Sequence, residues 1–131
     1  MEMKLELIPV PVVDIDRAKT FYVDQVGFVE DVDVRPADGV RFVQLTPPGS
    51  SCSIVLGTNL PSITGMTPGS LLGVHLVVDD IAAVRDELVS RGVQVAQIRD
   101  IGGGVQFAEI TDPDGNRLLL QEMAWRTGDK F

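Results

Sequence analysis

The sequence contains two weakly similar copies of one segment, and this internal repeat limits the possible folds more than any other feature. With a step of 65 residues, residues 12–14 (VVD) align with residues 77–79 (VVD), and Gly27 aligns with Gly92. The same step aligns two runs that end in turns, residues 44–49 (QLTPPG) and 109–114 (EITDPD). One offset therefore relates three separate signals. The repeat predicts two copies of one module.

Each copy has the pattern of a βαβββ module. Apolar residues at helical spacing predict helices over residues 15–25 and 81–91, each capped by an aspartate and ended by a glycine. Strands are expected over residues 4–13, 28–34, 40–45, 53–56, 71–78, 93–98, 105–110 and 117–122. We therefore expect a first module in residues 1–57, a linker rich in Gly, Pro, Ser and Thr in 58–70, a second module in 71–122, and a frayed tail in 123–131.

Composition and charge exclude several classes of function. With 44% hydrophobic and 23% charged residues, the chain has the composition of an ordinary globular domain. Its net charge of −8 argues against nucleic acid or an anionic membrane as partner, because both require basic patches. No apolar run is long enough to span a membrane, and residues 1–10 lack the pattern of a signal peptide. The single cysteine, Cys52, cannot form an internal disulfide, so we expect a cytoplasmic protein.

Five short motifs in order carry a family resemblance: VVDIDRA at 12–18, FY at 21–22, VGF at 26–28, VDDI at 78–81 and DPDGN at 112–116. Together they resemble the glyoxalase, bleomycin-resistance and extradiol-dioxygenase superfamily, whose fold is called vicinal oxygen chelate. The resemblance covers nearly the whole chain. It implies an α+β fold in which paired βαβββ modules form an open, cup-like sheet, often completed in a homodimer.

The resemblance also implies four metal-ligand positions. Two of them lie seven residues before the helix-capping aspartates Asp14 and Asp80, at Leu7 and Gly73. The third lies seven residues after Asp112, at Leu119, and the fourth lies one repeat step of 65 residues before Leu119, at Ile54. Aliphatic side chains and glycine offer no nitrogen or oxygen ligand. We therefore expect no metal, no cofactor, and neither metal-dependent glyoxalase nor dioxygenase activity.

Because alternate residues of a strand share a face, the surface of the predicted cup is mainly apolar with few polar groups, as in many small-molecule sites. Its expected ligand-contacting residues are Leu7, Pro9, Ile54, Gly73, His75, Leu119 and Gln121, with Phe42, Phe107 and Trp125 available to stack on a planar ligand at the rim. The sequence therefore predicts that a hydrophobic or planar small molecule binds in the cup. The acidic chain favours cationic ligands such as the bleomycins.

Three functional hypotheses remain. The first is a metal-free binding module, favoured because the family's ligands are missing and no other catalytic constellation replaces them. The second is a metal-independent enzyme of lyase or isomerase type, with His75 as general base and Glu109 or Gln121 as its partner. A structural histidine that hydrogen-bonds a neighbouring carbonyl explains His75 equally well. The third is a structural or regulatory homodimer.

Overall fold

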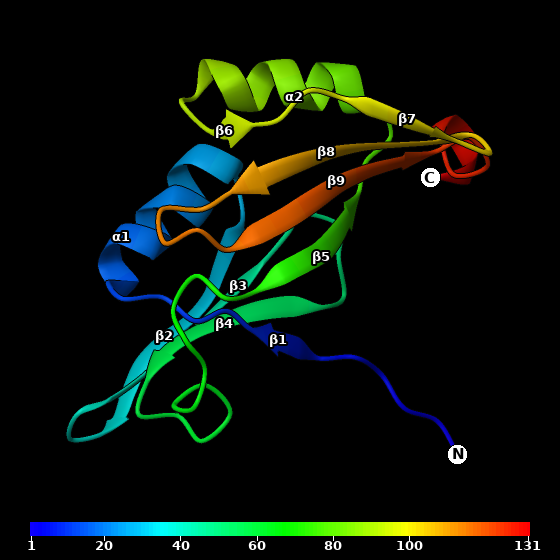
Figure 1. The fold of residues 1–131 in the computed structure, drawn as a ribbon. Helices are drawn as coiled ribbons and strands as arrows, with labels where there is room; N and C mark the ends of the chain where they lie inside the picture. Colours follow the sequence, from blue (N-terminus) through cyan, green and yellow to red (C-terminus); the bar gives the residue numbers. More distant parts are fainter.

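The computed structural model describes residues 1–131 and contains a βαβββ module followed by a similar module with one additional strand (Figure 1). The first consists of β1 (Leu7–Pro9), α1 (Ile15–Thr20) with its π-helical continuation η1 (Phe21–Val26), β2 (Val29–Ala37), β3 (Val40–Thr46) and β4 (Ser53–Thr58). The second consists of β5 (Leu72–Val77), α2 (Ile81–Ser90), β6 (Gln94–Val95), β7 (Arg99–Gly102), β8 (Val105–Thr111) and β9 (Arg117–Met123). A short 3-10 helix, η2 (Gly128–Lys130), follows. The predicted α+β fold class is confirmed.

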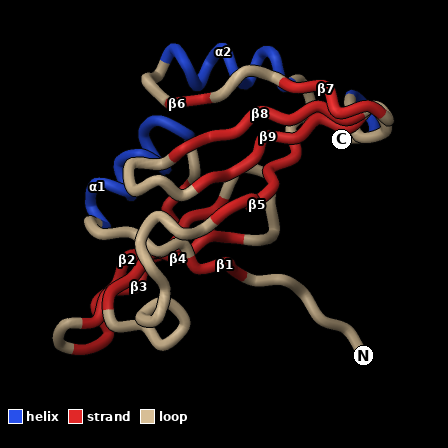
Figure 2. The backbone as a smooth tube through the Cα atoms, in the orientation of Figure 1, coloured by secondary structure: helices blue, strands red, loops and turns tan.

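Each module forms its own mixed sheet, seen as two sets of strands in Figure 2. Sheet A has the order β1-β4-β3-β2, and sheet B has the order β5-β9-β8-β6, with β7 also pairing to β8. The first strand of each module pairs parallel to the last, and the other pairs are antiparallel. Strand β1 lies at a sheet edge and is short, as Pro9 and Pro11 require, because proline has no N–H for a ladder.

Capping residues set the helix boundaries. Asp14 accepts a hydrogen bond from the Arg17 N–H at 3.1 Å, and Asp80 accepts one from the Ala83 N–H at 3.1 Å. Gly27 ends η1 with a φ of 95°, a left-handed conformation that glycine adopts without steric cost. Residues 93–98 do not form the single strand expected. They contain only the two-residue β6, and β7 lies outside the strands expected from the sequence.

One apolar core of 18 buried residues joins both modules. Val43 and Leu45 of β3 and Ala108 and Ile110 of β8 point into it, as strand alternation requires. Residues of both helices belong to the same core. The helices therefore cover one face of each sheet, as α2 covers sheet B in Figure 1. We call the other face the open face.

A buried polar network also joins the modules, through the DPDGN turn (112–116). The Tyr22 hydroxyl donates to Asp112 Oδ2 at 2.8 Å, and Asn116 Nδ2 donates to the Pro11 carbonyl at 2.8 Å. Asp112 and Asn116 are 4% and 0% exposed, so this turn is part of the interior. Burial, followed by the charge and hydrogen bond of Asp112, raises the pKa of Tyr22 far above its usual value.

The tail is more ordered than expected. Met123 is the last residue of β9, and the Ala124 N–H then donates to the Gly104 carbonyl at 2.8 Å. The Gly128 N–H donates to Asp79 Oδ1 at 2.6 Å, which holds η2 against the start of α2. These bonds keep the end of the chain beside the second module.

Candidate functional site

The open face of sheet B brings most of the predicted site residues of the second module together. Two rows of side chains cross β5, β9 and β8: Val77, Gln121 and Phe107 in one, and His75, Leu119 and Glu109 in the other. Their side chains are half-buried or exposed, whereas the alternate residues Leu118 and Leu120 are buried in the core. This face is therefore accessible to a ligand.

His75 has a defined partner on this face. Its Nδ1 lies 2.7 Å from Gln121 Oε1, and its ring packs edge-on against Phe107 with centroids 5.4 Å apart. Because a carbonyl oxygen can only accept, Nδ1 is the donor in this hydrogen bond. Glu109 lies 3.8 Å from the guanidinium of Arg117 and is separated from His75 by strand β9, a backbone distance of about 10 Å. Gln121, and not Glu109, is thus the partner of His75.

The open face of sheet A carries the predicted residues of the first module. Leu7 pairs with Ser53, Pro9 pairs with Val55, and Phe42 pairs with Gly57, which places all of them on one face. No hydrogen bond or ring contact joins this group to His75 and its neighbours. The predicted site residues therefore lie on two half-faces, one on sheet A and one on sheet B.

Ile54 does not lie on the open face, and the expectation that it shares a face with Leu7 is wrong. It is 3% exposed and belongs to the core. Leu45 and Ile110 are related by the step of 65 residues, and they pair with Ile54 and Leu118 in the last strand of each module. Ile54 and Leu118 are 64 residues apart, so the repeat step in this strand is 64 and not 65. The turn of residues 47–52 is one residue longer than residues 112–116, which explains this shift. The counterpart of Leu119 is Val55.

The corrected family positions do not fit a metal ion. They are Leu7, Val55, Gly73 and Leu119, none of which has a side-chain nitrogen, oxygen or sulfur. No group of three or more His, Cys, Asp or Glu residues lies close enough together to hold a metal. A divalent ion would need about four such ligands or several oxygens.

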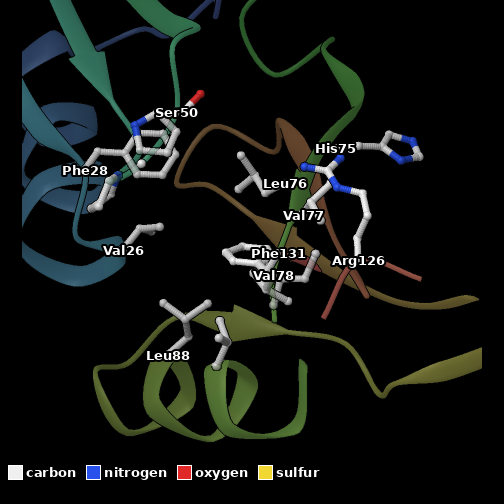
Figure 3. A pocket seen from close by; sticks show the side chains of 15 residues that line it. Val26, Phe28, Ser50, His75, Leu76, Val77, Val78, Leu88, Arg126 and Phe131 are labelled. Atoms are coloured by element: carbon white, nitrogen blue, oxygen red, sulfur yellow. The ribbon is translucent and has the colours of Figure 1, made fainter. Parts of the chain in front are cut away.

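A cavity of about 400 Å³ lies between the modules, along the unpaired edge of β5 (Figure 3). Its walls come from the residues before β2 (Val26, Phe28), the β3–β4 turn (47–50), β5 and the residue after it (75–78), α2 (Val84, Leu88), β9 (Leu120) and the tail (Arg126, Phe131). Nine of the 15 lining residues are hydrophobic, so the cavity is mainly apolar. His75 and Val77 belong both to this cavity and to the open face of sheet B.

The family model that describes the glyoxalase, bleomycin resistance protein and dioxygenase superfamily matches residues 4–120. The chain belongs to this superfamily. No helix has both the length and the apolar composition of a membrane span. No protein with a curated description matches the chain significantly.

Solved structures of this superfamily resemble the chain over almost its full length. TnmS3, an antibiotic binding protein from Streptomyces sp. CB03234, is 36% identical, with 94% of this chain and 98% of TnmS3 covered and a TM-score of 0.82. A glyoxalase/bleomycin resistance protein from the same organism is 38% identical, with 89% and 98% covered and a TM-score of 0.75. A superfamily member from Sphaerobacter thermophilus DSM 20745 is 29% identical, with 92% and 98% covered and a TM-score of 0.81.

The site residues predicted from the sequence include few of those that line the inter-module cavity. Of the ten predicted ligand-contacting residues, only His75 lines it. Gly73 lies at an irregularity of β5 with open space around it, and Trp125 is 54% exposed beside the β7–β8 turn. The polar composition of the tail gave no signal that Arg126 and Phe131 would reach the cavity wall, because their placement depends on contacts distant in sequence.

Proposed function

We propose that this protein binds a hydrophobic small molecule, without a metal and without chemical conversion, in the cavity between its modules. One observation carries the proposal: the cavity between the modules is lined mainly by apolar side chains, has the size of a ligand site, about 400 Å³, and contains no set of metal ligands in its lining. The similarity to an antibiotic binding protein, 36% identical over 94% of the chain, supports an antibiotic as the ligand.

Apolar contact is expected to supply most of the affinity. Burial of nonpolar ligand surface contributes about 25 cal/mol per Å², so 200 Å² of it contributes about 5 kcal/mol before the cost of association. The ring of Phe28 and the aliphatic side chains of Leu76 and Leu88 lie on the cavity wall and provide such contacts. In contrast, few polar lining groups are present, and loss of any one should weaken binding only in part.

The test enlarges one side chain of α2 that faces the cavity and, as a control, one side chain of the same helix that faces away from it. Val84→Trp places an indole on the cavity wall, whereas Val89→Trp places the same side chain on the same helix at a position that is 46% exposed. Binding is measured with the fluorescent probe N-phenyl-1-naphthylamine and with an antibiotic panel that includes bleomycin. A ligand at 100 times its Kd should add about 2.7 kcal/mol to the stability of the fold.

We expect at least a tenfold loss of probe affinity for Val84→Trp and no change for Val89→Trp. Thermal melts establish first that both variants fold. If Val84→Trp does not fold, Pro48→Trp in the β3–β4 turn blocks the opposite wall. Equal affinity of the wild type and a folded cavity-blocked variant would overturn the proposal, because the ligand would then bind elsewhere.

We further propose a cytoplasmic homodimer. The half-faces carry half-buried apolar side chains, such as Leu7 and Phe42 on sheet A and Phe107 and Leu119 on sheet B, and a second copy could cover them. The lone cysteine supports a reducing compartment. Light scattering after size-exclusion chromatography should give twice the chain mass of 14.2 kDa, and a mass of one chain would refute the dimer.

The hydrogen bond of His75 supports a second candidate, a metal-independent enzyme of lyase or isomerase type. The amide of Gln121 orients the ring so that Nε2 can accept a proton, which is the arrangement of a general base. Under this hypothesis a bound compound is converted, and His75→Ala slows conversion by about 10²-fold. Mass spectrometry of ligand recovered after incubation distinguishes the two functions, since recovery of unchanged ligand from the wild type excludes conversion of that compound.

A further inference from the structure

The inter-module cavity has one permanently charged side chain on its wall, Arg126. His75 is its only other ionisable side chain, and no aspartate or glutamate side chain lines it. This differs from the chain as a whole, which has a net charge of −8. The overall charge therefore does not describe the environment that a bound ligand would meet.

Arg126 is an arginine without a side-chain partner. Arg17, Arg41, Arg91 and Arg117 form ion pairs, and Arg85 donates to backbone carbonyls. Arg126 makes no ion pair and no side-chain hydrogen bond, a property that it shares only with Arg35 and Arg99. Neither of those two lines the cavity.

The backbone fixes where Arg126 stands. The Arg126 N–H donates to the Met123 carbonyl at 2.9 Å, directly after β9, and the hydrogen bond of Gly128 to Asp79 holds the next turn. Figure 3 shows the Arg126 side chain extending along β5 with its guanidinium turned toward the cavity. The Arg126 side chain is exposed at the rim of the cavity and has no carboxylate partner, so its guanidinium is available to pair with a ligand.

The chemistry of this wall favours one class of ligand. A guanidinium gives charge-assisted hydrogen bonds to carboxylate, sulfonate or phenolate groups, and these bonds are about twice as strong as neutral ones. A cationic ligand would instead meet an unpaired positive charge next to apolar walls, which is unfavourable. Asp79, beside this wall, already accepts a hydrogen bond from the Gly128 N–H at 2.6 Å, and salt screens acidic groups that lie beyond about 8 Å.

We propose that the inter-module cavity selects hydrophobic ligands that carry an anionic group, and that Arg126 holds this group. The inference rests on the proposed binding function and specifies the ligand class. It replaces the expectation of a cationic ligand that the net charge of the sequence suggests. Arg126 is then the residue that determines charge specificity. The apolar walls contribute the part of the affinity that does not depend on the charge of the ligand.

Two probes that differ by a single anionic group test this selection. 8-Anilino-1-naphthalenesulfonate is N-phenyl-1-naphthylamine with one added sulfonate, so their affinities separate charge recognition from apolar contact. We expect Arg126→Gln to weaken binding of the sulfonate probe about tenfold or more and to change binding of the neutral probe less than twofold. Arg126→Lys should retain part of the affinity. The control Arg99→Gln removes an equally unpaired arginine outside the cavity and should change neither Kd.

The outcomes separate this inference from the function on which it rests. If Val84→Trp abolishes binding of both probes and Arg126→Gln affects neither, the cavity binds ligands and the anion preference is refuted. If Arg126→Gln weakens both probes equally, the arginine acts through packing and the inference is likewise refuted. If Val84→Trp leaves both affinities unchanged, the cavity is not the site and the proposed function fails together with the inference.

Discussion

Removal of one hydroxyl group should show how much the buried network contributes to holding the modules together. Tyr22 is 0% exposed, and its hydroxyl donates to Asp112 Oδ2 at 2.8 Å across the seam between the modules. Tyr22→Phe removes only this hydrogen bond, because the ring that packs against Phe21 and Phe28 remains. Loss of a hydrogen bond to a buried charged group costs about 1.5 to 3 kcal/mol.

The other partners of Asp112 place the expected cost near the lower limit. The carboxylate retains the N–H groups of Asp114 and Asn116 and the side-chain amide of Asn116, all at 2.9 Å. We therefore expect Tyr22→Phe to lower the free energy of unfolding by about 2 kcal/mol, which corresponds to about 7 °C in Tm for a chain of this length. Urea denaturation gives the free energy, and calorimetry gives Tm.

A double-mutant cycle provides the decisive check. If Tyr22 and Asp112 interact as the structure shows, Tyr22→Phe and Asp112→Asn together cost about 1 kcal/mol less than the sum of the single variants. Additivity within about 0.5 kcal/mol would refute the reasoning, since it would mean that the two side chains do not act on each other.

Three further predictions concern ionisation and backbone conformation. The chain has a single tyrosine, so tyrosinate absorbance reports Tyr22 alone. Because folding raises the pKa of Tyr22, the stability that depends on its protonated form is complete below about pH 10 and falls above it. Tyrosinate should therefore appear only when the chain unfolds. Hydrogen bonds from Arg41 and, second, from Lys19 hold the pKa of Asp33 well below its usual range. The ionised Asp33 therefore stabilises the fold above about pH 4, and this contribution is lost as the pH falls further. The difference in unfolding free energy between the wild type and Asp33→Asn should shrink over that range. Gly27→Ala, at a φ of 95°, should lower the free energy of unfolding by about 1 kcal/mol, whereas Gly65→Ala, with open space around it and no positive φ, should be neutral or slightly stabilising in the same urea measurements.

Local signals in the sequence predicted the elements and the fold class. The aspartate caps and Gly27 fixed the helix ends, because capping depends on residues that are neighbours in the chain. Alternation placed His75, Leu119 and Gln121 on one face of sheet B. These features depend on local geometry, and a local pattern can therefore reveal them.

Longer-range features were not accessible in the same way. Ile54 was misplaced because one extra residue in the β3–β4 turn changes the register of β4, and a register shift of one residue reverses the direction of every side chain in a strand. The interior role of the DPDGN turn was also missed, since its sequence is equally typical of an exposed turn. The cavity forms from six segments that meet only in the folded chain.

The pseudo-symmetry of the repeat explains why the cavity lies where it does. Counted from the helix caps Asp14 and Asp80, the counterpart of Tyr22 is Leu88, and the counterpart of the DPDGN turn is the β3–β4 turn. On one seam, the large Tyr22 ring and the polar side chains of the turn fill the space between the modules. On the other seam, a smaller leucine faces a turn of Pro, Pro, Gly and Ser, and the hollow remains.

This comparison predicts that one larger side chain can close the cavity. Leu88→Phe should extend a ring into the hollow, lower the affinity for N-phenyl-1-naphthylamine at least tenfold, and leave stability unchanged or raise it by about 1 kcal/mol, because filling a void gains contacts. Leu118→Phe is the matched control: Leu118 is 1% exposed and does not line the inter-module cavity, so the same enlargement should cost about 1 to 3 kcal/mol. If Leu88→Phe destabilises the fold as much as the control and leaves probe binding intact, the space beside Leu88 is not the hollow that the symmetry argument requires.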